Sequence, residues 1–298
     1  MSQKLKQSFK TVSVALGGLL LGAAVEWYRL GQPSKAHSVT LKNQVPTLFI
    51  HGYAGNRFSS GSMIKRFERY GWGQKSTVIV IKADGTLKIT GDPNVPGGFI
   101  QVLFDNNRMS VMHQTDWLWR LMSTLKNEYS IERVNILAHS MGGVTVLNYL
   151  SKFGISDRVP HVEKVVTLGV PFNDLEVGKD GKEIEYRPLT PNGPSVMTPL
   201  FKNIKKHRYI ISPTTKFLNI AGDLNNGTHS DGSVSLDSVL SLRYLLVKQA
   251  YREIIVTDEK AGHFKLHENR MIDEKIGCFL FGSQAKKAFE KSETKYCF

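Results

Sequence analysis

The chain has 298 residues, of which 41% are hydrophobic and 22% are charged, so its length and composition suit one sizeable globular domain with a short appendage. Its formal net charge of +13 is compatible with an anionic membrane or wall polymer as a partner. The lysines and arginines are spread along the chain and no nucleic-acid motif is present, which argues against nucleic-acid binding and favours a basic, solvated surface.

The first thirty residues have the pattern of a signal peptide or an uncleaved signal-anchor. An uncharged, largely apolar run over residues 11–25 follows three lysines, Lys4, Lys6 and Lys10, and precedes Trp27 and Tyr28. No convincing cleavage site follows the run, which favours retention as an anchor. We therefore expect the rest of the chain on the extracellular face of the cell membrane, or secreted. The alternative is an ordinary amphiphilic helix packed on the domain.

Residues 31–44 are polar and are predicted to be a linker. Short apolar runs then predict buried strands, and apolar residues at helical spacing predict helices between them. The strands are expected at 45–50, 77–81, 134–138, 162–168, 216–221 and 252–256, and the helices around 117–125, 142–153 and 270–280. This alternation predicts an α/β fold with a mostly parallel central sheet and helices on both faces. The domain is expected to span 45–285, followed by a polar C-terminal tail over 286–298.

Residues 172–213 interrupt the alternation with many charges and four prolines. So long an irregular insertion is usually functional, and it leaves the sheet at the carboxyl ends of the strands, where open α/β sheets carry their sites. We expect it to act as a lid that governs substrate choice, with Met197, Leu200 and Phe201 offering apolar contact. The alternative is a mobile excursion without a role.

Ser140 lies in a strand–turn–helix context. The strand predicted to end at Ala138 is followed by His139-Ser140-Met141-Gly142-Gly143 and then by a helix. This is the context of the G-x-S-x-G elbow, in which a tight turn exposes a nucleophilic serine and small residues two before and two after it avoid clashes. Alanine replaces the first glycine here. The alternative is a glycine-rich helix start that binds an anion.

Four segments together resemble the α/β-hydrolase superfamily in its lipase and esterase branch. More narrowly, the chain from about Val45 to Gly282 resembles the bacterial, often surface-associated hydrolases known as domain of unknown function 915. The matching segments are Phe49-Ile50-His51-Gly52, Ala138 to Gly143, Gly222-Asp223 through Gly232, and Gly262-His263 through Asn269. The closing histidine-rich segment points to the narrower family.

A serine hydroxyl needs a base and an acid, which follow it in chain order in this fold. The residues leave His263 and His267 open as the base, and Asp223 and Asp231 open as the acid. The family's spacing from base to closing helix implies His263. The D-G-x-V pattern that begins at Asp231 resembles the acid loop of related lipases and implies Asp231.

The oxyanion hole needs two backbone N–H donors, and we expect them from Tyr53 and Met141. His51 is expected to buttress the loop that carries Tyr53. His139 is expected to point away from the base.

The expected function is hydrolysis of carboxylic esters through an acyl-enzyme, with a small-molecule or lipid ester as substrate and possible membrane or anionic wall association. The same residues would serve a peptidase, thioesterase or acyltransferase, and a non-catalytic surface-interaction protein is a further alternative. No cofactor and no metal is expected, because the sequence has no H-E-x-x-H motif or carboxylate cluster. Cys278 and Cys297 do not form a disulfide framework, although a single bridge between them stays open.

Overall fold

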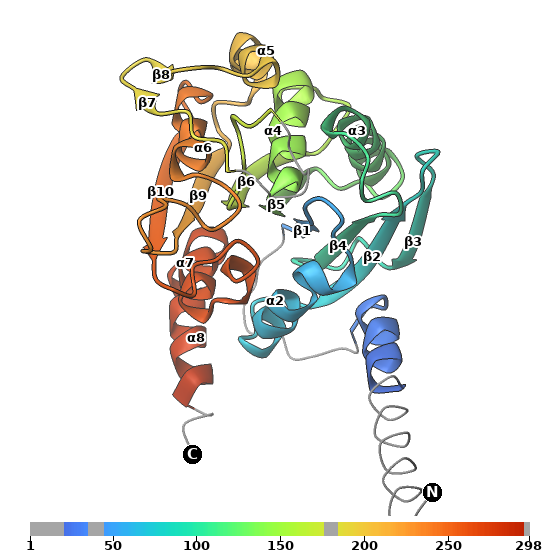
Figure 1. The fold of residues 1–298 in the computed structure, drawn as a ribbon. Coiled ribbons are helices and arrows are strands. Elements are labelled where there is room, and N and C mark those ends of the chain that lie inside the picture. Colours follow the sequence, from blue (N-terminus) through green and yellow to red (C-terminus); the bar gives the residue numbers. More distant parts are fainter. Residues whose placement is uncertain (1–20, 35–44, 176–183, 295–298) are drawn as a thin grey trace, which may run out of the picture.

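A central eight-stranded sheet organises the chain in the computed structural model, which describes residues 21–34, 45–175 and 184–294. Its strand order is β10-β9-β6-β5-β1-β4-β2-β3, and every neighbouring pair is parallel except β2 with β3 (Figure 1). The mostly parallel sheet predicted from the sequence is thus confirmed. The strands are β1 Thr47–Ile50, β2 Lys75–Ile81, β3 Leu87–Gly91, β4 Phe99–Phe104, β5 Arg133–His139, β6 His161–Leu168, β9 Lys216–Asp223 and β10 Ala250–Thr257.

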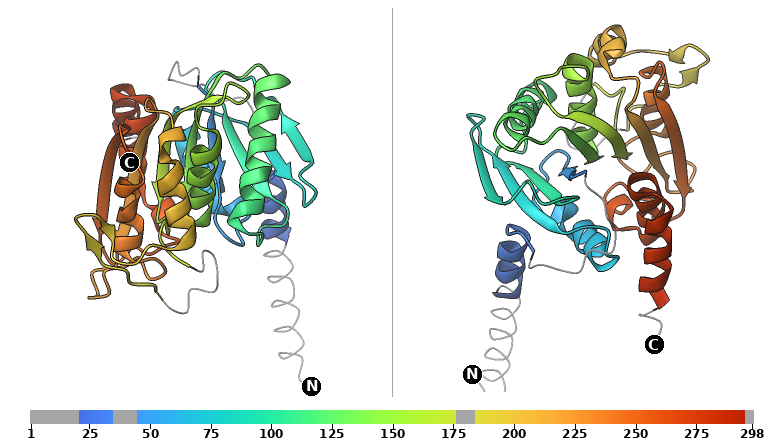
Figure 2. Two further views of the ribbon diagram at one scale, coloured as in Figure 1. Left: turned by 90° about the horizontal axis from the view of Figure 1, so that it is seen from above. Right: turned by 180° about the vertical axis from the view of Figure 1, so that it is seen from behind.

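Helices cover both faces of the sheet (Figures 1 and 2). Along β1, the side chains of Leu48 and Ile50 join the core beneath α3, α4 and α5, whereas Phe49 between them joins the core beneath α2 and α7. This alternation follows from the two-residue period of a strand and explains why the central strands are apolar throughout. The helices are α2 Arg57–Arg69, α3 Val111–Asn127, α4 Met141–Phe153, α5 Pro199–His207, α6 Leu236–Leu240, α7 Arg270–Phe281 and α8 Ser283–Thr294.

The sequence pattern did not predict β4, although it lies between β1 and β2 near the middle of the sheet. Its buried polar residue Gln101 breaks the apolar run. The Gln101 amide donates to the backbone oxygen of Arg57 and to the hydroxyl of Ser60, both on α2. A partner from a distant part of the chain therefore makes a polar residue acceptable in a central strand.

Residues 21–30 are helical and pack against the domain beside α2 (Figure 1). Leu30 is buried, and the Lys75 ammonium donates to its backbone oxygen. The backbone N–H of Ser34 donates to the oxygen of Lys75 as well. Residues 31–34, which the sequence analysis assigned to a linker, are therefore packed on β2, and the remainder of that predicted linker, 35–44, lies outside the described residues.

Among the described residues, no helix combines the length and the apolar character needed to cross a bilayer. The anchor predicted within residues 1–30 lies for the most part outside them, because the description begins at residue 21. The predicted anchor thus stays a prediction.

The segment predicted as an insertion contains a core helix. Phe201 and Ile204 on α5 are fully buried and belong to the same core cluster as α3 and α4. Phe201 is thus a core residue, and the expectation that it contacts an acyl chain is wrong. The remainder comprises a small hairpin, β7 Leu189–Thr190 with β8 Gly193–Pro194, and residues 176–183, which lie outside the described part of the chain.

The first part of the predicted polar C-terminal tail belongs to helix α8. Ala285 is buried, and its backbone oxygen accepts a hydrogen bond from the indole of Trp72. The ring of Phe289 lies 5.0 Å from that of Tyr70. Ala285, Ala288 and Phe289 are the apolar residues of α8 that pack on the domain. Cys297, the second cysteine, lies outside the described residues.

Candidate functional site

Ser140 forms the turn between β5 and α4. Its backbone has φ 52° and ψ −135°, in a region that L-residues other than glycine rarely adopt. The Ser140 N–H donates to the oxygen of Leu168 at the end of β6, which helps to hold the turn in place. Such a strained turn places the side chain at the carboxyl edge of the sheet and is characteristic of a nucleophile elbow.

Close backbone approaches explain the small residues around Ser140. A Cβ added to Gly52 would lie 2.7 Å from the Ser140 Cβ, and one added to Gly142 would lie 2.4 Å from the oxygen of His51. Both glycines therefore let the β1–α2 loop lie directly against the elbow. Ala138 is completely buried at the end of β5, so the alanine that replaces the usual glycine is accommodated in the core.

Asp231 and His263 form a buried pair. The Asp231 Oδ2 lies 2.7 Å from the His263 Nδ1, and the backbone N–H of His263 donates to the oxygen of Asp231. The other carboxylate oxygen, Oδ1, accepts from the backbone N–H groups of Ser233 and Val234. A carboxylate fixed in this way makes Nδ1 the protonated nitrogen of His263 and leaves Nε2 as the basic nitrogen.

The competing acid and base are held elsewhere. The Asp223 carboxylate accepts from the backbone N–H of Asn225 and so stabilises a turn. The His267 Nδ1 lies 3.0 Å from Glu268 Oε1. Of the two acids and two histidines that the sequence left open, the structure brings together Asp231 and His263.

Two backbone N–H groups are available at the elbow. Within the described residues, neither the N–H of Tyr53 nor that of Met141 has a hydrogen-bond partner. Met141 is the first residue of α4, where the helix dipole adds to the attraction for negative charge. The sequence predicts these two N–H groups as the oxyanion donors, and that role stays a prediction.

His51 holds the loop that carries Tyr53. It is buried, its Nδ1 lies 2.7 Å from the Gly52 oxygen, and its Nε2 accepts from the backbone N–H of Phe104 on β4. Burial lowers the pKa of His51 to about 4, so the ring stays neutral at physiological pH and its Nδ1–H donates to the Gly52 oxygen. The loop is further attached by Asn107, whose amide donates to the oxygen of Gly55.

His139 contacts the base, contrary to the sequence-based expectation that it points away. Its Nε2 lies 3.0 Å from the backbone oxygen of His263, and the two ring centroids are 4.6 Å apart. Burial, with smaller contributions from His263 and His267, holds the pKa of His139 well below its usual value. A neutral imidazole that donates to the backbone of His263 fixes the position of the base without adding a charge beside it. The sequence alone does not reveal this contact, because His139 and His263 are 124 residues apart and meet only in the folded chain.

A buried ionic network supports the loop that carries His263. The Arg66 guanidinium on α2 donates to both oxygens of Asp273 on α7, to the backbone oxygen of His267 and to Glu268. The Tyr70 hydroxyl also donates to Asp273. The network joins residues more than 190 positions apart, so no local motif could have indicated it. It fixes α7 and the preceding loop to the helix that follows the Tyr53 loop.

Asp174 is a second carboxylate near Asp231. It accepts a hydrogen bond from the Ser238 hydroxyl, and burial raises the pKa of Asp174 to about 6. A raised pKa means that the folded state disfavours the charged form. The resulting destabilisation is absent below pH 3.8, the usual pKa of the group, and complete above pH 6.

We therefore expect Asp174→Asn to increase the free energy of unfolding by up to about 3 kcal/mol at pH 8 and by little at pH 4. Denaturant unfolding at both pH values measures the difference, and Asp157→Asn, on an exposed turn, is the control. An equal gain at both pH values would show that the charge of Asp174 is not the cause.

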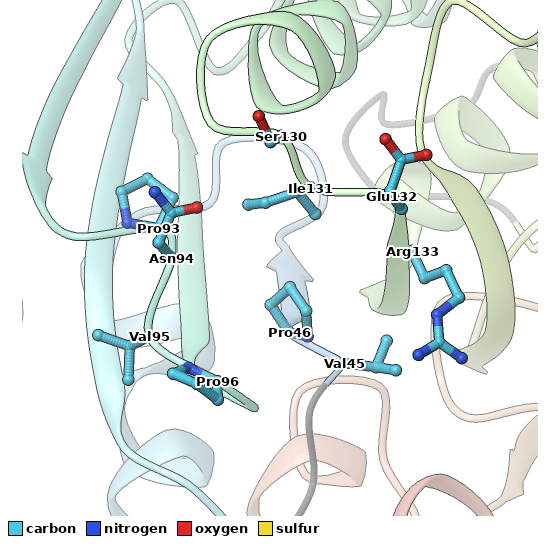
Figure 3. Close-up of a pocket in the computed structure, with 10 residues that line it drawn as sticks. All are labelled: Val45, Pro46, Pro93, Asn94, Val95, Pro96, Ser130, Ile131, Glu132 and Arg133. Carbon is cyan, nitrogen blue, oxygen red and sulfur yellow. The ribbon is translucent and has the colours of Figure 1, made fainter.

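A pocket of about 270 Å³ lies at the opposite edge of the sheet (Figure 3). It is lined by Val45 and Pro46 before β1, residues 93–96 before β4, and residues 130–133 at the start of β5. Since β5 has seven residues, this amino edge is about 20 Å from Ser140. The pocket is thus separate from the elbow. Within the described residues, no group of three or more potential metal ligands is present.

Comparisons with known proteins agree with this architecture. The family described as alpha/beta hydrolase of unknown function (DUF915) matches residues 34–283, and the chain therefore belongs to this family. The solved structure of the lin2722 gene product from Listeria innocua is 28% identical, with a TM-score of 0.71 over 80% of this chain and 94% of that chain.

A "putative cell surface hydrolase" from Lactobacillus plantarum WCFS1 shares the fold at 23% identity, with a TM-score of 0.65 over 85% of this chain and 98% of that chain. The search of curated proteins gave no match. The family and fold inferred from the sequence are thus confirmed.

Proposed function

We propose that this alpha/beta hydrolase cleaves carboxylic esters through an acyl-enzyme, with Ser140 as nucleophile, His263 as base and Asp231 as the acid that orients it. The observation that carries the proposal is the combination of a strained serine turn with the buried 2.7 Å contact between Asp231 and His263. The N–H groups of Tyr53 and Met141 supply the oxyanion hole.

In the first step the His263 Nε2 takes the proton of the Ser140 hydroxyl while Oγ bonds to the acyl carbon. The electron pair of the carbonyl moves onto its oxygen, which the N–H groups of Tyr53 and Met141 stabilise. Collapse of this intermediate expels the alcohol, which takes the proton from His263. Water then repeats the sequence on the acyl-enzyme and releases the acid, while the Asp231 carboxylate stabilises the transient imidazolium.

An ester is an easier substrate than a peptide, because an alcohol is the better leaving group and needs less help from the protein. A peptidase, thioesterase or acyltransferase would use the same residues, so the acyl group must be identified by assay. A panel of esters of increasing chain length, assayed against an amide and a thioester of the same acids, distinguishes these activities. Hydrolysis of the amide alone would overturn the proposal.

We also propose that the chain is attached to the outer face of the cell membrane by its N-terminal segment. The lysines before residue 11 and the apolar run 11–25 support this orientation, because positively charged flanks remain on the cytoplasmic side. External protease applied to intact cells should degrade the domain. Protection of a full-length cytosolic chain would contradict the location.

Asp231→Asn is expected to lower kcat on the order of 10⁴-fold. Its Oδ1 must still accept from Ser233 and Val234, so the new NH₂ group would face the His263 Nδ1 and select the wrong tautomer. Asp223→Asn is the matched control, because its amide oxygen can still accept from Asn225. Steady-state kinetics on one ester measures both variants, and a larger loss for Asp223→Asn would transfer the acid role to that residue.

A further inference from the structure

We propose that the carboxyl edge of the sheet is a membrane-contact surface, held by residues 21–30 against an anionic phospholipid bilayer, and that the ester substrate enters the site from that bilayer. The contact surface consists of exposed apolar residues that follow the carboxyl ends of four strands: Phe58, Met112, Leu175 and Phe264. The identity of the substrate rests on the proposed function, whereas the membrane contact does not.

The N-terminal helical residues are fixed to α2 at its first turn, where the loop carrying Tyr53 ends. The backbone oxygen of Trp27 accepts from the Arg57 guanidinium, which also lies over the Trp27 ring at 5.0 Å. The rings of Trp27 and Phe58 are 5.5 Å apart. Further along α2, Lys65 forms an ion pair with Glu26, and Gly61 packs against Leu30. Five contacts thus set the direction in which the N-terminal helical residues leave the domain.

No spacer separates the apolar run from this attachment. The run ends at residue 25, and Trp27 is only about 3 Å further along a helix. A bilayer into which the apolar run is inserted would therefore lie against the start of α2. Trp27 and Tyr28 are 42% and 65% exposed, as expected for aromatic side chains at a membrane interface.

Further exposed apolar side chains lie at the carboxyl edge of the sheet. Phe264, next to the base His263, is 70% exposed, and Phe58 and Met112 are 42% and 46% exposed at the starts of α2 and α3. Single exposed apolar residues are ordinary on a protein surface. Here they follow β1, β4, β6 and β10, so they share the edge that carries Ser140.

Charge favours an anionic bilayer over a second copy of this chain. The net charge of +13 opposes self-association and attracts anionic headgroups. Arg29, Arg108 and Lys265 are exposed on or beside the contact surface. Basic residues around exposed aromatic side chains are the composition typical of an interfacial surface.

The test places nitroxide labels on the full-length chain in vesicles of phosphatidylglycerol and phosphatidylcholine. Phe264→Cys and Phe58→Cys are labelled separately in a background with Cys278→Ser and Cys297→Ser. Ile155→Cys is the matched control, because Ile155 is 64% exposed just after α4, at the opposite edge of the sheet. Power-saturation measurements then compare collisions with lipid-soluble oxygen and with a water-soluble nickel complex.

We expect oxygen collisions to dominate at positions 264 and 58, and nickel collisions to dominate at 155. Equal exposure to nickel at 264 and 155 would overturn the membrane contact. A label at 264 that reaches neither collider would also overturn it, because another protein copy would then cover the surface.

A kinetic comparison tests the entry of substrate. Phe58→Ser with Met112→Ser should lower turnover of an ester embedded in vesicles by about tenfold or more, because two apolar contacts with lipid are lost while the site residues keep their contacts. Turnover of a water-soluble short-chain ester should not change, and Ile155→Ser should affect neither substrate. Equal losses on both esters would overturn entry from the bilayer. If the unaltered chain hydrolysed no ester, the proposed function would fail while the nitroxide result would still decide the membrane contact.

Discussion

Ser140→Ala is expected to abolish ester hydrolysis, with a loss in kcat on the order of 10⁶-fold. The substitution removes only the hydroxyl oxygen. Ser140 is the one described residue between β5 and α4, and its φ is 52°. Residual activity should come only from the oxyanion donors and from substrate binding. Steady-state turnover of a chromogenic ester measures the effect.

The fold of Ser140→Ala should be unaffected, because Ser140 contributes no side-chain hydrogen bond to the cap of α4. Alanine is strained at a positive φ to a similar degree as serine, so the melting temperature should change little. Full turnover by the purified variant would remove Ser140 from the mechanism. Loss of folding together with loss of activity would instead make the variant uninformative about chemistry, and Ser140→Cys would then replace it, with a reactive thiol expected at the same turn.

His263→Ala is expected to have a loss of similar size, because the serine then lacks the base that accepts its proton. His267→Ala should retain turnover within about tenfold, because the His267 side chain contacts Glu268 and His139 rather than Asp231. The two variants remove the same side chain four positions apart in one loop. Comparing the two variants therefore controls for the general effect of removing a histidine side chain from that loop.

The comparison is made on kcat and on labelling by a serine-directed phosphonate. We expect labelling to be lost in His263→Ala and kept in His267→Ala. Loss of labelling in His267→Ala alone would assign the base to His267 instead.

The parts of the fold that depend on local pattern were predictable from the sequence. Strands β1, β5, β6 and β9 each contain a short, mainly apolar stretch, and α4 follows the elbow with apolar residues at helical spacing. Strand β4 was not predicted, although Gln101 interrupts it no more than Asn135 interrupts β5. The partners of Gln101 on α2 are 41 and 44 residues away. Local pattern cannot indicate a polar residue that is satisfied at such a distance.

The candidate site, too, was predictable from the sequence only in part. The order of serine, acid and histidine and the two backbone donors follow from motif and chain order, and the structure brings Asp231 and His263 together. The contact of His139 with the backbone of His263 and the attachment of the His263 loop by Arg66 depend on loops that meet only in the folded chain. No spacing in the sequence encodes these contacts.

The central claim is that Ser140 is a nucleophile activated by His263, and covalent labelling tests it most directly. The full-length protein is incubated with a fluorophosphonate, digested, and its labelled peptide identified by mass spectrometry. Attack by the Ser140 oxygen on phosphorus expels fluoride, so we expect one phosphonylated residue, Ser140, with the label absent from His263→Ala. Absence of any label on the folded protein, or a label on another serine that persists in Ser140→Ala, would contradict the account.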